Sequence, residues 1–239
     1  MSCILNIETS TSVCSVALSM DGEVLFAKAS FDGPSHAALL GVFVEEALSV
    51  LKKKGKKALD AVAVSSGPGS YTGLRIGVSV AKGLCFGFGI PLIGIHTLDI
   101  MAATVNSKGD SQIVSMTDNC LYCAMLDARR MEVYAAIYDA SLKPVRETKA
   151  DIVEVGTYAS YLEKGKVCFF GNGASKCKSV ITSPNAIFIE DIHPLAVNMI
   201  PVSEQAFAAG KFEDTAYFEP FYLKEFQATV AKNKVLLAR

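Results

Sequence analysis

Two acids that each follow a short apolar segment have the clearest chemical potential in this sequence. Glu8 ends the segment of residues 4–8, and Asp127 ends the segment of residues 121–127. Both segments read as strands, and each is followed by a small polar turn and a second apolar segment. A carboxylate at such a strand end can bind magnesium or face the phosphates of a ligand. A lone acid at a strand end is also commonly only solvated.

A glycine-rich turn at residues 67–75 is the second candidate. An apolar strand-like run at residues 61–64 precedes it, and we expect a helix over residues 71–86, capped by Ser70 or Thr72. Free N–H groups at a helix start can bind an anion. The spacing differs from the standard phosphate-binding loops, since no lysine follows the glycines and Thr72 stands where a third glycine would be.

The helix after this turn carries small residues at every fourth position, namely Gly73, Gly77, Ala81 and Cys85. They form one stripe that lets another backbone come close. The stripe can pack against the protein's own sheet or neighbouring helix, or it can be a docking face for a partner helix.

Histidines and cysteines give little support for a metal site or a nucleophile. His36, His96 and His193 each lack a second histidine four residues later, so we expect no helical metal pair and no catalytic residue. Cys120 and Cys123 form a single C-x-x-C pair, for which buried structural thiols are favoured over zinc or redox use. Seven cysteines without regular spacing fit reduced thiols in the cytosol.

Length, composition and net charge restrict the class of protein that this chain can be. With 239 residues, of which 51% are hydrophobic and 20% charged, the chain can form one large domain or two lobes. A net charge of −1 does not favour a chain that holds nucleic acid by itself. The lysines of residues 52–57 suit the C-terminus of a helix over residues 36–53, with an RNA-contact patch as the alternative. We see no signal peptide, and the uncharged run of residues 83–95 falls short of the roughly 20 residues of a membrane span, so we expect a cytoplasmic protein without membrane contact.

The second half of the chain repeats the plan of the first. The expected strands are residues 4–8, 13–18, 24–29, 61–64 and 91–95 in the first half, and 121–127, 132–138, 166–170 and 186–190 in the second. In each half, an apolar strand runs into a G-x-G turn and a helix start. A duplicated β-β-β-α-β-α unit is the plan of the α/β actin-like, Hsp70-like and sugar-kinase (ribonuclease H-like) fold. We expect an N-terminal lobe at residues 1–108, a C-terminal lobe at 109–212, and a tail at 213–239.

In that fold, two lobes close on a nucleotide, and the acids after the two first strands face its phosphates and magnesium. Those positions are Glu8 and Asp127 here, and the glycines that would approach an adenosine are Gly171 and Gly173. The turn at residues 67–75 has no lysine for a phosphate. We therefore expect a degenerate cleft with no required cofactor, in which ATP and magnesium bind weakly at most.

Four motifs and the tail carry a more specific resemblance. Residues 4–11, 67–77, 81–84 and 127–134 resemble the TsaB (YeaZ) family, and residues 219–224 resemble its Pro-x-Tyr-Leu-Arg end, with Lys224 for Arg. The resemblance implies a non-catalytic partner of a TsaD-like transferase, which holds the metal and threonylcarbamoylates the tRNA adenosine next to the anticodon. It also implies a TsaE-like ATPase that binds the pair, a homodimer through the same helices, and contact with tRNA only through the complex. The alternative is a stand-alone actin-like-fold ATPase or small-molecule kinase.

The family docks through the two helices of the N-terminal lobe. The residues expected at that contact are Leu40, Val44 and Leu51 from the first helix, and Tyr71, Leu74, Arg75, Val78, Ala81 and Lys82 from the second.

Overall fold

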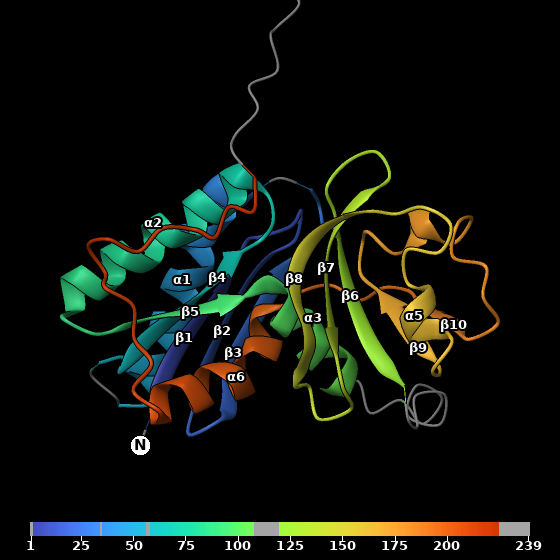
Figure 1. The fold of residues 1–239 in the computed structure, drawn as a ribbon. Coiled ribbons are helices and arrows are strands. Elements are labelled where there is room, and N and C mark those ends of the chain that lie inside the picture. The colour runs from blue at the N-terminus through green and yellow to red at the C-terminus, as the bar shows by residue number, and fades with distance from the viewer. Residues whose placement is uncertain (1, 34, 56–57, 108–119, 225–239) are drawn as a thin grey trace, which may run out of the picture.

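Two five-stranded sheets with helices on their faces make up the computed structural model, which describes residues 2–33, 35–55, 58–107 and 120–224 (Figure 1). The first half forms β1 (Cys3–Glu8), β2 (Cys14–Met20), β3 (Glu23–Ser30), α1 (His36–Lys53), β4 (Ala61–Gly67), α2 (Tyr71–Phe88), β5 (Leu92–His96) and α3 (Thr97–Ser107). The second half forms β6 (Leu121–Asp127), β7 (Glu132–Tyr138), β8 (Pro144–Ile152), α5 (Ala159–Leu162), β9 (Val167–Phe170), the 3₁₀ turn η1 (Ser175–Cys177), β10 (Ala186–Ile189) and α6 (Ala196–Ala208).

The strand order confirms the predicted duplication and the α/β actin-like fold. The first sheet runs β3-β2-β1-β4-β5, and the second runs β8-β7-β6-β9-β10, so corresponding strands take the same places. In both sheets the first three strands pair antiparallel, and the fourth strand pairs parallel to the first. The third strand of the second lobe, β8, was not predicted.

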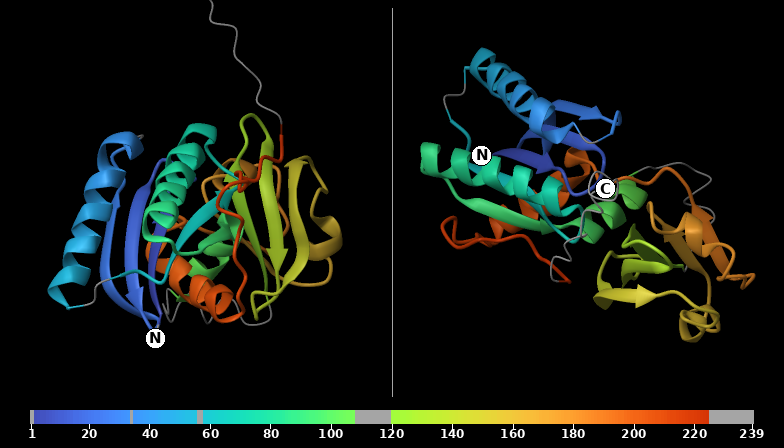
Figure 2. Two further views of the ribbon diagram at one scale, coloured as in Figure 1. Left: turned by 90° about the vertical axis from the view of Figure 1, so that its left-hand side faces the viewer. Right: turned by 90° about the horizontal axis from the view of Figure 1, so that it is seen from above.

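Helices distinguish the two lobes. In the first lobe, α1 and α2 are 18 residues each and lie side by side on one face of the sheet (Figure 2). Their counterparts in the second lobe are the four-residue α5 and the three-residue η1. The helix predicted after residues 171–173 was therefore wrong, because only a single 3₁₀ turn follows them. The first lobe alone presents a pair of long helices.

Helix ends follow the sequence signals only in part. Ser70 caps α2, since its Oγ accepts from the Gly73 N–H at 3.2 Å. Ser35 precedes α1, but its side chain makes no capping bond, and its Oγ donates to the Gly33 carbonyl instead. The last helix begins at Ala196, so Pro201 lies inside it rather than at its start.

Packing crosses the boundary expected after residue 108. The last helix of the first half, α3, packs on the second sheet through Leu98, Met101 and Val105. The last helix of the second half, α6, packs on the first sheet through Met199 and Ile200. Figure 1 shows both helices between the two sheets. The expected boundaries thus follow the chain and not the packing, and residues 108–119 themselves lie outside the described part.

The described part of the tail, residues 213–224, lies along the outside of α2 (Figure 1). The Glu213 N–H donates to the Leu92 carbonyl at 2.9 Å, and the Phe221 N–H donates to the Ser66 carbonyl at 2.7 Å. Lys82 Nζ donates to two carbonyls of the same segment. The tail is therefore held on the first lobe as far as Tyr222, and its remainder at 225–239 lies outside the described residues.

The small-residue stripe of α2 is filled by the protein's own β1–β2 turn. A Cβ added to Gly73 would lie 2.2 Å from the Thr9 carbonyl oxygen, and one on Gly77 would lie 2.2 Å from Thr9 Oγ1. Thr9 Oγ1 also donates to the Gly73 carbonyl at 2.8 Å. Of the two interpretations of the stripe, packing within the chain is the one that the structure supports.

We predict that Gly73→Ala lowers the free energy of unfolding by about 1–3 kcal/mol, the usual cost of overfilling a packed interior. The added methyl group meets the backbone of the β1–β2 turn, which has little room to move. Gly83→Ala in the same helix is the matched control, because a Cβ there meets nothing within 4 Å. It should stabilise the chain by about 0.5–1 kcal/mol through helix propensity. Urea denaturation measures both, and equal effects of the two changes would refute the packing role.

Candidate functional site

Glu8 lies at the end of β1 with no exposed surface. Its Oε1 accepts from the Ser10 N–H at 2.5 Å, while its Oε2 has no partner among the described residues. Burial raises the pKa of Glu8 from 4.5 to about 7, and hydrogen bonds from Ser10 and Ser65 offset part of that rise. The acid is enclosed by the protein rather than presented to an open cleft.

The start of α2, the candidate anion site, is occupied by the same turn. The Ser70 N–H donates to the Ser10 carbonyl at 2.6 Å, and the Gly73 N–H donates to Ser70 Oγ. Gly69 approaches so closely that a Cβ there would lie 2.3 Å from the Ser10 carbonyl oxygen. These contacts use the positions that a bound phosphate would need.

The second acid and the two glycines of the expected nucleotide cleft also have local structural partners. Asp127 forms an ion pair with Lys176. A Cβ on Gly171 would lie 2.3 Å from the Met125 carbonyl oxygen, and one on Gly173 would lie 2.8 Å from the Leu126 carbonyl carbon. Close packing of the Gly171–Gly173 turn against β6 explains both glycines without a nucleotide.

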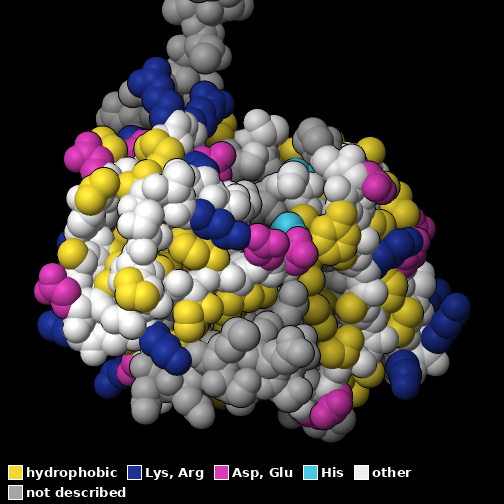
Figure 3. Space-filling model, turned by 90° about the vertical axis from the view of Figure 1, so that its right-hand side faces the viewer, with side chains coloured by type: hydrophobic (Ala, Val, Ile, Leu, Met, Phe, Trp, Pro, Cys, Tyr) yellow, Lys and Arg dark blue, Asp and Glu magenta, His cyan; other side chains and the backbone are white. Residues whose placement is uncertain are grey.

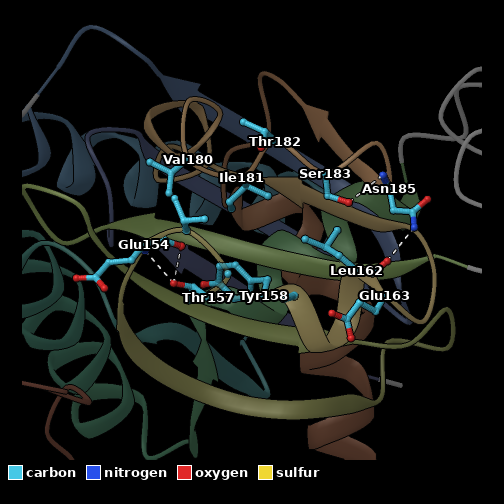
Figure 4. Close-up of a pocket in the computed structure, with 13 residues that line it drawn as sticks. Glu154, Thr157, Tyr158, Leu162, Glu163, Val180, Ile181, Thr182, Ser183 and Asn185 are labelled. Atoms are coloured by element: carbon cyan, nitrogen blue, oxygen red, sulfur yellow. Dashed lines mark hydrogen bonds between the residues drawn. The ribbon is translucent and has the colours of Figure 1, made fainter.

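A cavity of about 420 Å³ lies in the second lobe between α5 and residues 180–185 (Figure 4). Its polar groups bond to one another: Thr157 Oγ1 accepts from the Glu154 N–H at 2.8 Å, and Asn185 Nδ2 donates to the Leu162 carbonyl at 2.8 Å. Val180 and Ile181 form an apolar part of the cavity wall. None of these groups forms a pattern for a defined chemistry.

A second cavity, of about 340 Å³, lies at the carboxyl ends of β9 and β10 beside Gly171. This is the edge at which open α/β sheets bind ligands. Its lysine, Lys178, is paired with Glu190, and the ring of His193 lies edge-on to Phe31 at 5.6 Å. The cavity can admit a small molecule, but its charged side chains already have partners.

Six of the nine side chains expected at the partner contact lie inside the first lobe. Each has an exposed fraction of at most 6% and packs in the lobe's interior: Leu40, Val44, Leu51, Leu74, Val78 and Ala81. These six side chains hold the helices on the sheet, so they offer almost no exposed surface to a partner.

The other three, Tyr71, Arg75 and Lys82, lie at the surface and contact the tail. Arg75 Nε donates to the Tyr222 hydroxyl at 3.1 Å, and the rings of Tyr71 and Tyr222 lie 5.1 Å apart. The Arg75 guanidinium also lies over the Tyr71 ring at 4.2 Å. The tail therefore covers part of the surface that these residues would offer.

The solvent-facing side of α1 and α2 forms what we call the outer helix surface. Its residues are Ala38, Gly41, Val42, Glu45 and Ser49 of α1, and Thr72, Ser79, Gly83 and Phe86 of α2. Val42 is 46% exposed and Phe86 is 88% exposed. A Cβ added to Gly41 or Gly83 would meet nothing within 4 Å. Glycines inside helices at solvent positions were the sequence signal for this surface.

The histidines and the C-x-x-C pair are separated in the structure. His36 is 5% exposed, and its Nε2 donates to the Thr11 carbonyl at 2.8 Å. Cys120 packs beneath α3, whereas Cys123 packs on the opposite face of the second sheet beneath α5, so the two thiols do not form one site. Within the described ranges, no three His, Cys, Asp or Glu residues gather as metal ligands would. None of the described helices is long and apolar enough to cross a membrane.

The fold and this surface define a two-lobed actin-like protein with one helix-covered lobe and one reduced lobe. A family model described as TsaD, tRNA N6-adenosine threonylcarbamoyltransferase, matches residues 32–232. The tRNA threonylcarbamoyladenosine biosynthesis protein TsaB of Escherichia coli (strain K12) is 31% identical over 245 residues, covering 92% of this chain and 94% of the relative. The chain belongs to the TsaB (YeaZ) family.

Two further comparisons place the chain within this group. The solved structure of YeaZ from Pseudomonas aeruginosa superposes with a TM-score of 0.72 at 25% identity, covering 93% of this chain and all of that one. A tRNA N6-adenosine threonylcarbamoyltransferase of Nitratidesulfovibrio vulgaris (strain DP4) is 38% identical over 112 residues, covering 41% of this chain and 31% of the enzyme. Part of the chain is thus similar to a transferase.

We predict that the stability of the chain falls as pH rises from 4.5 to 7 because of Glu8. The folded state holds the proton up to a pH of about 7, whereas the unfolded state releases it near 4.5. At 1.4 kcal/mol per pKa unit, the loss amounts to about 3 kcal/mol above pH 7. Glu8→Gln, which keeps an acceptor for Ser10, should remove this contribution and stabilise the chain at pH 8.

Urea denaturation at pH 5 and pH 8 measures this effect. Glu163→Gln, at an exposed position, is the control and should leave the difference between the two pH values as it is in the native chain. If Glu8→Gln leaves that difference unchanged as well, Glu8 does not carry the pH dependence.

Proposed function

We propose that this chain is a non-catalytic partner of a TsaD-like transferase and docks to it through the outer helix surface. The complex would threonylcarbamoylate the tRNA adenosine next to the anticodon, which places the chain in the cytoplasm. The observation that carries the proposal is the pair of open glycines, Gly41 and Gly83, inside the two surface helices.

Glycine in a helix interior costs about 0.5–1 kcal/mol relative to alanine. At Gly73 and Gly77 the β1–β2 turn explains this cost, whereas no described residue comes within 4 Å of a Cβ at Gly41 or Gly83. Two helices can cross closely where one of them lacks side chains. The room that these two glycines leave for an approaching backbone supports a helical partner.

Exposed apolar side chains on the same surface support this inference. Phe86 projects from the last turns of α2 with 88% of its surface exposed, and Val42 is 46% exposed on α1. Aromatic residues that become buried at an interface often supply much of the binding energy. Both side chains would lose water contact against a partner.

A protein with the same fold is the natural partner. A transferase similar to this chain would present a comparable pair of helices, and two pairs would form a four-helix contact. The same geometry would allow a second copy of this chain to bind, giving a homodimer that competes with the transferase. A TsaE-like ATPase would then bind the assembled pair.

The groups considered for catalysis are either enclosed by the protein or paired within the chain, which supports a non-catalytic role. Glu8 is enclosed, Asp127 is paired with Lys176, and His36 is bonded to the Thr11 carbonyl. The second candidate function, a stand-alone ATPase or small-molecule kinase, is favoured by the 340 Å³ cavity beside Gly171. Measurable ATP turnover by the chain alone would support that alternative.

We predict that Gly41→Leu and Gly83→Leu each weaken binding to the TsaD-like transferase of the same cell at least tenfold. Leucine blocks close approach of a helix, but its Cβ meets no described residue within 4 Å and leucine is the better helix former, so each variant should be as stable as the native chain or more so. Isothermal titration calorimetry measures the affinity, and urea denaturation measures the stability.

Gln205→Leu is the control, since it adds the same side chain at an exposed position of α6, outside the outer helix surface. Native affinity is expected for this variant. Native affinity of both glycine variants as well would exclude the outer helix surface as the docking site, and a native chain that binds no transferase would exclude the proposed function.

A further inference from the structure

The β6–β7 turn presents two adjacent arginines at the surface of the second lobe. Arg129 and Arg130 are both exposed, and both have positive φ, at 72° and 50°. Residues other than glycine rarely adopt this conformation, and it persists only where the surrounding structure holds it. The fold therefore sets the backbone of this turn and the point at which each of the two side chains leaves it.

Backbone hydrogen bonds hold this turn. The Arg129 N–H donates to Asp127 Oδ1 at 2.9 Å, and the Glu132 N–H donates to the Arg129 carbonyl at 3.1 Å. The Ala128 N–H donates to the Glu132 carbonyl, also at 3.1 Å. Both ends of the turn are thus closed by bonds that do not involve the guanidinium groups.

The two acids nearest the arginines are neutralised by lysines from other parts of the chain. Lys176 forms an ion pair with Asp127 and also donates to the Glu132 carbonyl at 2.6 Å. Lys224, from the tail, donates to Glu132 Oε2 at 2.6 Å. These lysines leave the guanidinium groups of the two arginines without a hydrogen bond or ion pair to any of the described residues.

The turn therefore carries a local excess of two positive charges on a chain whose net charge is −1. Figure 3 shows lysine and arginine side chains at the upper edge of one face and charges of both signs over the rest of it. Planar guanidinium groups bind phosphate oxygens with two parallel hydrogen bonds. Two adjacent groups of this kind suit an extended polyanion.

The tail places this turn beside the first turn of α2. Lys224 contacts Glu132, and two residues earlier Tyr222 packs on Tyr71. A transferase docked on the outer helix surface would therefore bring its bound substrate towards the arginines.

We propose that Arg129 and Arg130 contact the phosphate backbone of the tRNA on which the complex acts. This inference rests on the proposed function for the identity of the polyanion. The contact carries no sequence information, because it involves phosphates and not bases, and it would orient the tRNA across the two proteins. It also goes beyond the expectation that tRNA is reached only through the partner.

The test compares two double variants that each remove two positive charges. Arg129→Asn/Arg130→Asn removes the proposed contacts, and asparagine tolerates positive φ, so the turn should keep its shape. Lys149→Gln/Lys164→Gln is the control at two exposed positions of the second lobe, one in β8 and one just after α5. The probe is fluorescently labelled, unmodified tRNA, titrated against the chain alone at low salt and against the chain with the transferase.

The arginine variant should bind tRNA at least fivefold more weakly, and the slope of log K against log salt should fall by about 1–2. The control should bind as the native chain does. Transferase affinity, measured by calorimetry, should stay within twofold for both variants.

Three results would overturn the inference: unchanged tRNA affinity and salt slope, equal weakening by both double variants, or no measurable tRNA binding by the native chain in either setting. Loss of transferase binding with tRNA binding retained would instead assign the arginines to an acidic protein surface. A native chain that binds tRNA but no transferase would refute the proposed function, and the comparison on the chain alone would still decide the role of the arginines.

Discussion

The insertion of the β1–β2 turn into α2 is the contact on which the first lobe depends. Ser70 donates its N–H to Ser10, and Thr9 donates its hydroxyl to the Gly73 carbonyl. The glycines of α2 permit this approach because a single Cβ would meet backbone oxygen at little more than 2 Å. The turn fixes the start of α2, encloses Glu8, and removes from water the N–H groups that would otherwise bind an anion. Because the β1–β2 turn packs against the start of α2, the glycine turn of this lobe binds the protein's own chain instead of a nucleotide phosphate.

Much of the fold follows from the sequence, since hydrophobic period and glycine turns mark nine of the ten strands in their correct halves and the fourth and fifth strands of both lobes in order. The lengths of the helices in the second lobe could not be predicted in the same way, because a G-x-G turn after a strand predicts where a helix starts but not how long it continues. Cys120 and Cys123 lie on opposite faces of the second sheet, because residues three apart along an extended segment point to opposite sides of a sheet. The spacing of the C-x-x-C pair thus already argues against one shared thiol site.

The partner residues could not be predicted because both sides of α2 carry small residues at helical spacing. Gly73 and Gly77 lie inward and Gly83 lies outward, and the sequence shows only that all are small. What separates them is a contact between Thr9 and Gly73, residues 64 positions apart. Leu40, Val44 and Leu51 were misassigned for a related reason: an amphipathic helix reveals its apolar side, and that side belongs first to the protein's own core.

The two lobes present different surfaces. In the first lobe, two long helices cover the sheet and leave an outer surface with open glycines and an exposed phenylalanine. In the second lobe, the corresponding helices have only a few residues, and the β6–β7 turn carries two arginines whose guanidinium groups have no partner among the described residues. The described part of the tail connects the outer helix surface and the β6–β7 turn. It runs along α2, and its Lys224 pairs with Glu132 beside the arginines. A surface suited to a helical partner and a turn suited to phosphates are therefore held together by the same segment, although neither lobe alone contains both.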